Sequence, residues 1–281
     1  MQKIKSQIAF DYLTIKTTKS RIQKGLLAIP SSLIDLFPKN SSKVYLINEQ
    51  GKEEIKNFTP YNSSSRECRI GGLKNFYSKY KIKDGDELVI QFLEDSKFKI
   101  IPEKIFKKQV LELEKVIEKI NNEKEIEKTF KKLSDITNKD SEEVIKNEFV
   151  RLSDQEVLAR KIRIKPETKT KESVPLSLRI ILLKMYNGNC QVSNFTFLTR
   201  TGIPYFEIHH IDPTKGNHLK NLIVVSPNVH KQFTYSNLEQ FFDNEGWIRK
   251  VKFNEDTYTV FQIIDKLPRF FEKEIHSLSP H

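Results

Sequence analysis

The stretch Phe206–Phe233, FEIHHIDPTKGNHLKNLIVVSPNVHKQF, decides how the rest of the chain is interpreted. The chain has six histidines, and four of them fall inside this stretch: His209, His210, His218 and His230. A histidine pair ends a short apolar run, and an Asn-Leu pair follows at Asn221. Ser226 is a suitable helix N-cap and Pro227 a suitable first helical residue, so we expect a strand at the histidine pair and a helix that carries His230.

These residue types suit the hydrolysis of a phosphodiester. The reaction needs a base to activate water and a cation to stabilise charge at the scissile phosphate. A histidine near its ordinary pKa of roughly 6.5 can accept a proton at neutral pH. Adjacent residues of a strand point to opposite sides. One of His209 and His210 can therefore bind a metal ion while the other faces the water.

The layout resembles the HNH, or ββα-metal, nuclease motif, and the preceding string RIILLKMYNGNCQVSN (179–194) extends the resemblance. It covers residues 178 to 236. The resemblance implies that His210 is the general base and that Asn221 ties the loop together and orients that base. It also implies that His209 and His230 are the metal ligands. The helix N-terminus would face the phosphate.

The resemblance implies a divalent metal ion, with magnesium expected and manganese as the alternative. Two histidine ligands would also admit zinc or nickel, so the sequence leaves the identity of the ion open. Many HNH proteins hold a structural zinc with two cysteine pairs, and only Cys190 remains of those four here. No structural zinc is therefore expected.

Several neighbouring residues have two interpretations. Glu207 lies one strand period before His209, so it either assists the metal or faces solvent, and the solvent-facing position is slightly favoured. His218 is expected to be a loop histidine. Four basic side chains are candidate phosphate contacts: Arg200, Lys215, Lys220 and Lys231.

The first third of the chain predicts a small β-barrel. Short apolar or β-branched runs between residues 8 and 101 are separated by Gly, Pro and Asn, and Asp84-Gly85-Asp86 is a strong turn signal. SSLIDLF (31–37), with Ser31 or Ser32 as N-cap, and GLKNFYSKY (72–80) predict two short helices. Several short strands with two short helices are typical of a barrel.

Three segments resemble the B-three pseudobarrel DNA-binding domain: KSRIQKGLLAIPSSLIDLFP (19–38), RECRIGGLKNFYSKYKI (66–82) and DGDELVI (84–90). The resemblance implies two arms, 17–24 and 61–69, that grip the major groove. Guanine would be read by Arg21, Arg66 and Arg69, and adenine by Gln23 and Asn62. Ser20, Ser64 and Lys24 would hold phosphates. Taken without the resemblance, both segments are ordinary polar loops.

Residues 103–172 predict a helical connector. A heptad-like stripe is formed by Phe106, Val110, Leu113, Ile117 and Ile120. Two capping boxes are predicted, at Asp140 with Glu143 and at Ser153 with Glu156. RKIRIKPETKTKES (160–173) is basic and polar, which indicates a linker or a flexible phosphate-contacting segment. We therefore expect an α+β chain of three parts: a B-three-like domain (1–102), a connector (103–172) and an HNH nuclease domain (173–281).

Composition agrees with a nucleic-acid partner. The net charge of +11 suits a polyanion, because lysines and arginines that neutralise phosphates release condensed counterions. Two cysteines, Cys68 and Cys190, argue against a disulfide framework. No apolar stretch approaches the roughly 20 residues that span a bilayer. The expectation is a protein of the prokaryotic cytoplasm that binds double-stranded DNA and no membrane.

The sequence thus predicts a site-specific double-strand DNA endonuclease, similar to a type II restriction enzyme, that works by a one-metal mechanism. A DNA-binding regulator with an inactive nuclease domain is the first alternative. A homing or modification-dependent endonuclease is the second. Cutting both strands with one site requires a homodimer or two sequential nicks, and the sequence leaves both open.

Overall fold

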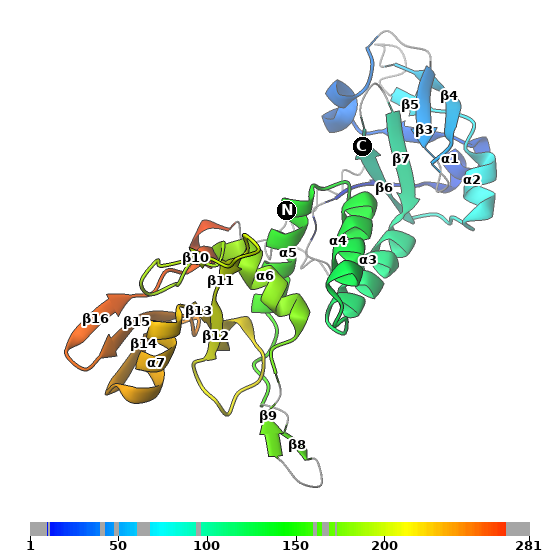
Figure 1. The fold of residues 1–281 in the computed structure, drawn as a ribbon. Helices are drawn as coiled ribbons and strands as arrows, with labels where there is room; N and C mark the ends of the chain where they lie inside the picture. The colour runs from blue at the N-terminus through cyan, green and yellow to red at the C-terminus, as the bar shows by residue number, and fades with distance from the viewer. Residues whose placement is uncertain are drawn as a thin grey trace. The chain divides into compact units, whose positions relative to one another are not determined.

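The computed structural model describes residue 10 and residues 12–39, 43–47, 51–60, 68–93, 97–159, 162–164, 169–171 and 173–267. The chain is of mixed α+β structure (Figure 1). It divides into two compact units, one drawn mainly from Met1–Leu111 and the other mainly from Lys139–Phe270. The division into three parts at residues 102 and 172 stays a prediction.

A seven-stranded sheet forms the first unit. Its strands run in the order β1 (Leu13–Lys16), β6 (Glu87–Phe92), β7 (Lys97–Pro102), β3 (Lys43–Ile47), β4 (Glu53–Thr59), β5 (Cys68–Ile70) and β2 (Leu27–Ile29). The pairing of β3 with β7 is parallel, and the other pairs are antiparallel.

The sheet curls into a barrel-like form. In a flat sheet with strands about 4.8 Å apart, β1 and β2 would lie on the order of 30 Å from each other. Yet Ile15 of β1 and Leu27 of β2 belong to one buried cluster, to which every one of the seven strands contributes. Strong curling is the arrangement that lets end strands share one core. The prediction of a small β-barrel is confirmed at this level.

Two short helices pack against this sheet where the sequence predicts them, the 3-10 helix η1 (Ser31–Leu36) and α2 (Lys74–Lys79). A third, α1 (Lys19–Lys24), lies in the segment expected to be an arm or a polar loop, so that helix is missed by the sequence. Gly25 ends α1 with φ of 67°, and a Cβ there would lie 2.6 Å from Cγ of Lys74, so the close approach of α1 to α2 requires glycine. The predicted N-cap at Ser31 or Ser32 is wrong, since Pro30 occupies the N-cap position.

Three helices follow: α3 (Glu103–Ile117), α4 (Glu123–Thr137) and α5 (Ser141–Ser153). The N-cap half of the box at Asp140 is confirmed, because its side chain accepts a hydrogen bond from the backbone N–H of Glu143 at 2.8 Å. The box at Ser153 is wrong. Ser153 is the last residue of α5, and its hydroxyl donates to the carbonyl of Val150 instead.

The segment after α5 contains more regular structure than the sequence predicts. Strands β8 (Ile162–Ile164) and β9 (Lys169–Lys171) pair antiparallel with Ile162 opposite Lys171. Ile-Arg-Ile and Lys-Thr-Lys are both short enough to be overlooked among charged neighbours. A two-stranded hairpin therefore stands where a linker is expected.

The last third of the chain contains β12 (Glu207–His210) and α7 (Pro227–Tyr235), which carry His209, His210 and His230 (Figure 1). Around them in the chain are α6 (Leu176–Tyr186), β10 (Phe197–Leu198), β11 (Pro204–Tyr205), η2 (Leu219–Asn221) and β13 (Leu222–Val225). A three-stranded sheet of β14 (Leu238–Phe242), β15 (Ile248–Phe253) and β16 (Asp256–Thr259) follows, and then η3 (Ile263–Lys266). A common buried cluster joins Ile223 and Val225 of β13 to Val229 of α7 and Val251 of β15. In the described part of the chain, no helix is long and apolar enough to cross a membrane.

Candidate active site

Two antiparallel strands and a helix position the histidines. β12 pairs with β13 so that Glu207 lies opposite Val225 and His210 opposite Leu222. The helix α7 begins directly after β13. Its N-cap is Ser226, whose hydroxyl accepts from the N–H of Val229 at 3.4 Å, and Pro227 is its first residue. The predicted strand and helix are confirmed.

Asn221 fastens the loop between these strands. It is 4% exposed, and its Oδ1 accepts from the N–H of Asp212 at 2.8 Å. Its Nδ2 lies within hydrogen-bond distance of three carbonyl oxygens, those of Asp212, Lys215 and Gly216, at 3.0, 3.2 and 3.1 Å. The side chain therefore closes the loop that begins directly after His210.

His209 and His230 come together from β12 and α7. Their ring centroids lie 5.0 Å apart, and the ring of His209 stacks on Phe233 at 4.4 Å. Burial, with further contributions from His230 and His210, lowers the pKa of His209 to about 4. A neutral imidazole is the form that binds a metal ion, so His209 is in the ligating state at neutral pH.

Glu207 holds the second of these histidines. Its Oε2 accepts from Nδ1 of His230, and its Oε1 accepts from the hydroxyl of Tyr205 at 3.1 Å. The hydrogen bond from His230 lowers the pKa of Glu207, so the carboxylate is charged. The favoured solvent-facing position of Glu207 is wrong. Histidine ligands commonly donate their second ring nitrogen to a carboxylate, and with this pair formed Nε2 of His230 would be the atom to bind a metal ion.

The donor set at this point fits a divalent ion with an incomplete protein shell. In the part of the chain that the structure describes, no group of three or more His, Cys, Asp or Glu side chains is arranged to hold a metal ion. His209 and His230 would supply two nitrogens. Water and phosphate oxygens would fill the other positions, as magnesium and manganese sites allow.

The other two histidines of the stretch are both hydrogen-bonded. Nε2 of His210 lies 2.9 Å from Oδ1 of Asn217. His218 is buried, and its Nε2 lies 2.7 Å from the carbonyl oxygen of Gln155. Its Nδ1 accepts from the N–H of Lys220 at 3.1 Å. His218 is a loop residue, as predicted, but it serves as a buried anchor.

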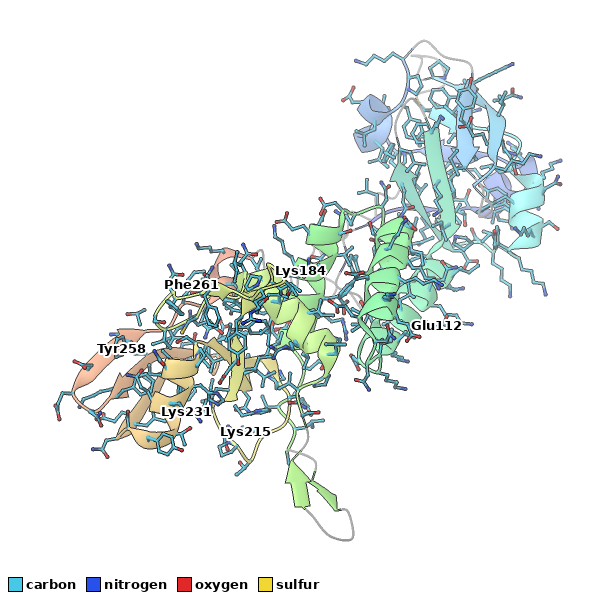
Figure 2. The ribbon with its side chains drawn as sticks, viewed as in Figure 1. Glu112, Lys184, Lys215, Lys231, Tyr258 and Phe261 are labelled. Carbon is cyan, nitrogen blue, oxygen red and sulfur yellow. The ribbon has the colours of Figure 1, made fainter. Side chains whose placement is uncertain are left out.

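The candidate phosphate contacts lie on different elements. Arg200 is exposed in the turn between β10 and β11. Figure 2 labels Lys215, in the loop after β12, and Lys231, on α7. Nζ of Lys215 lies 3.6 Å from Oδ2 of Asp212, and Nζ of Lys220 lies 5.9 Å from the centre of the Trp247 ring. Their contact with phosphate stays a prediction.

The candidate DNA-reading residues of the first unit are divided between two elements. Ser20, Arg21, Gln23 and Lys24 lie on α1, where all but the half-buried Arg21 are exposed. Arg69 lies on β5, opposite Ala28 of β2 and Thr59 of β4. Asn62, Ser64 and Arg66 lie outside the described residues. The reading of bases by any of these eight stays a prediction.

One contributor to the site, Asn217, is missed by the sequence, and the hydrogen bond of another, Glu207, is not predicted. Glu207 is considered there, but its hydrogen bond to His230 depends on the packing of α7 against β12. Asn217 is not singled out at all, although its position seven residues after His210 in a polar loop is the one available signal.

Cys190 is buried, and its Sγ accepts from the N–H of Ser193 at 3.4 Å. The expectation of no structural zinc stays a prediction.

Comparisons with known proteins give a limited result. No model of a known protein family matches the chain, and no curated protein matches it. Among solved structures, the hypothetical Arabidopsis thaliana protein At1g16640.1 is 19% identical, over 32% of this chain and 87% of that chain, with a TM-score of 0.28. The Arabidopsis FUS3-DNA complex is 16% identical, over 32% of this chain and 94% of that chain, with a TM-score of 0.26. TM-scores of this size carry no argument about activity, so the interpretation rests on the residues of this chain.

Proposed function

We propose that this chain is a metal-dependent, site-specific DNA endonuclease in which the second unit cuts and the first unit recognises the sequence. The observation that carries the proposal is the arrangement of His209, His210, Asn221 and His230 on two antiparallel strands and a helix. This is the arrangement that the HNH resemblance implies, residue by residue.

Each side chain has a separate task in the proposed reaction. His210 takes the proton from the attacking water, and Asn221 keeps the loop after His210 closed. His209 and His230 would hold the divalent ion, and Glu207 orients His230. The ion, when bound, supplies charge stabilisation at the scissile phosphate and the leaving oxygen.

Recognition is assigned to α1 and β5 because their exposed and half-buried polar residues suit groove contacts. Arg21 and Arg69 can donate two hydrogen bonds to a guanine edge, and Gln23 can pair with adenine. Ser20 and Lys24 would set the register on phosphates. The net charge of +11 favours the encounter with DNA at low salt.

A cleavage and binding experiment tests the catalytic half of the proposal. His210→Ala should lose cleavage of plasmid DNA in Mg²⁺ or Mn²⁺ by at least about a hundredfold, the size of a general-base contribution. Its affinity for the same DNA should stay within about twofold of wild type, and EDTA should stop the wild-type reaction. A His210→Ala protein that cuts at the wild-type rate overturns the assignment. A wild-type chain that binds DNA but never nicks it supports the regulator instead.

The recognition half has its own test. Arg21→Ala should weaken binding to the preferred sequence by about 1–3 kcal/mol and relax the choice of base at one position. Lys24→Ala should weaken binding to all sequences alike and flatten the salt dependence of binding. Lys124→Ala, an exposed lysine of α4, is the charge-matched control and should leave sequence choice unchanged. Equal effects of all three variants on every sequence contradict the assignment of α1.

A further inference from the structure

Asn217 connects the ring of His210 to a backbone carbonyl far away in the sequence. Its Oδ1 lies 2.9 Å from Nε2 of His210. Its Nδ2 donates to the carbonyl oxygen of Ser173 at 3.0 Å. A carbonyl oxygen can only accept, so the amide nitrogen must face Ser173 and the amide oxygen must face His210.

This orientation determines where the proton of the imidazole lies. An amide oxygen is an acceptor, so Nε2 of His210 must carry the hydrogen of the pair. In the neutral ring, Nδ1 then carries the lone pair. The carbonyl of Ser173 thus selects one tautomer of His210, with the side chain of Asn217 as the intermediary.

The loop around Asn217 is also held by the segment that follows α5, at Leu158 and Ala159. The N–H of Gly216 donates to the carbonyl of Leu158 at 2.6 Å, and Lys215 forms a β-bridge with Ala159. A Cβ at Gly216 would lie 3.0 Å from the oxygen of Leu158, so the segments approach closely because residue 216 is glycine. These contacts limit the freedom of Asn217 to turn away from His210.

We propose that Asn217 is a positioning residue, which fixes the tautomer and the orientation of the His210 ring through its bond to the carbonyl of Ser173. The inference rests on the proposed function where it treats His210 as the base. The tautomer itself is a property of the folded chain without metal or DNA, and it is measured separately.

Nitrogen NMR of the ring tests the proposal. In protein labelled with ¹⁵N-histidine, the signals of His210 are identified by their loss in His210→Gln. Wild type should show a protonated Nε2 and an unprotonated Nδ1. Asn217→Leu, which removes both polar atoms, should give a mixture of the two tautomers. Asn217→Asp retains an acceptor oxygen and should retain the wild-type tautomer.

Cleavage kinetics add a readout of function. Asn217→Leu should lower the single-turnover rate by about 10–100-fold, the effect typical of a residue that orients a catalytic ligand or base. Its Kd for DNA should stay within about twofold of wild type. Thr214→Ala is the matched control, because it removes a hydrogen bond to Asp212 in the same loop without contact to His210. It should change neither the rate nor the tautomer.

The possible results separate the two claims. A hydrogen on Nδ1 in wild type, or an unchanged tautomer in Asn217→Leu, overturns the role of Asn217. If Asn217→Leu does not fold, the ring of wild type decides by itself, and an unprotonated Nε2 there overturns the role of Asn217. If the tautomers behave as expected but the wild-type chain cuts no DNA with any divalent ion, the nuclease proposal fails and the positioning of the ring stands.

Discussion

Asn221 is the residue on which the loop of the candidate site most depends. Its buried amide accepts from the N–H of Asp212, and its Nδ2 shares two hydrogens among three carbonyl oxygens within hydrogen-bond distance. A buried polar group that loses its hydrogen-bond partner destabilises a protein by about 1–3 kcal/mol. Here several backbone groups of the loop have the side chain of Asn221 as their partner. The side chain of Asn221 therefore stabilises the loop that begins directly after His210, and the position of His210 depends on that loop.

Asn221→Ala should lower the free energy of unfolding by about 2–4 kcal/mol, because the backbone groups of the loop lose their partners together. Urea denaturation measures the change. Asn228→Ala is the matched control, since Asn228 is an exposed asparagine of α7, and it should change stability by less than about 0.5 kcal/mol. Equal stabilities of the two variants would contradict the role of Asn221.

His218 is a buried histidine whose two ring nitrogens are both in use. Nε2 donates to the carbonyl of Gln155, so the neutral ring accepts at Nδ1 from the N–H of Lys220. Burial lowers the pKa of His218, and Lys220 lowers it further. A second proton on the ring, at Nδ1, would point at the N–H of Lys220 and break the hydrogen bond between them. Protonation of His218 therefore destabilises the native loop.

Stability should therefore fall as the pH drops below about 6.5, the ordinary pKa of histidine. Below that pH the unfolded chain binds a proton that the folded chain does not. Proton binding therefore favours the unfolded state, and the free energy of unfolding decreases. His218→Gln should lose part of this dependence. The measurement is the free energy of unfolding in urea at pH 7.5 and pH 5.5, for both proteins. An identical fall in the two proteins would show that His218 contributes nothing to it.

Part of the candidate site can be predicted from the sequence, and part of it cannot. His209, His210, Asn221 and His230 are predicted because their spacing within one short stretch is distinctive. Asn217 is missed because its role depends on Ser173, which lies 44 residues earlier. A contact of that kind is created by the fold, and the position of Asn217 in a polar loop after His210 does not by itself predict it.

At the scale of elements, α5 contains a buried charge that constrains its packing. Glu148 is 0% exposed, and Oε2 accepts from Nη2 of Arg151 at 2.9 Å. Nη1 of Arg151 donates to Oε1 of Glu118, the residue directly after α3, at 2.7 Å. Burial raises the pKa of Glu148, while Arg151 opposes that rise. The arginine thus satisfies a carboxylate that water does not reach.

Arg151→Met should destabilise the protein by about 3–5 kcal/mol, because it leaves Glu148 buried and unpaired. The double variant Glu148→Leu/Arg151→Met should recover most of that loss, since it removes both charges together. Thermal or urea unfolding of the three proteins measures the difference. If the double variant is less stable than Arg151→Met alone, the carboxylate is not the source of the cost.

Elements with clear boundaries are predicted well from the sequence. Leu176–Tyr186 is a helix that ends at Asn187, with φ of 54°, and α7 begins with Ser226 and Pro227. Ser153 misleads because a Ser-x-x-Glu pattern is also compatible with the last residue of a helix. The β8–β9 hairpin has only three residues in each strand, too few for a periodic pattern.

At the scale of the molecule, the seven-stranded sheet and the ββα elements belong to separate compact units. The proposal divides the work in the same way, with recognition in the first and cleavage in the second. Recognition without cleavage gives no nuclease, and under the proposal the cleavage site alone would have little choice of sequence. Both halves are therefore needed for cuts at defined positions.

Sequencing the DNA ends that the protein produces in a complex mixture of DNA tests most directly whether one unit recognises the sequence and the other cuts. The wild-type chain is incubated with the mixture in Mg²⁺ or Mn²⁺, and the new ends are sequenced. The account predicts ends at one fixed distance from a shared short sequence, absent in EDTA and absent with His210→Ala. Methylated and unmethylated DNA are both included, because a modified base is one of the possible targets. Metal-dependent ends spread without sequence preference, or equal ends from His210→Ala, would contradict the account.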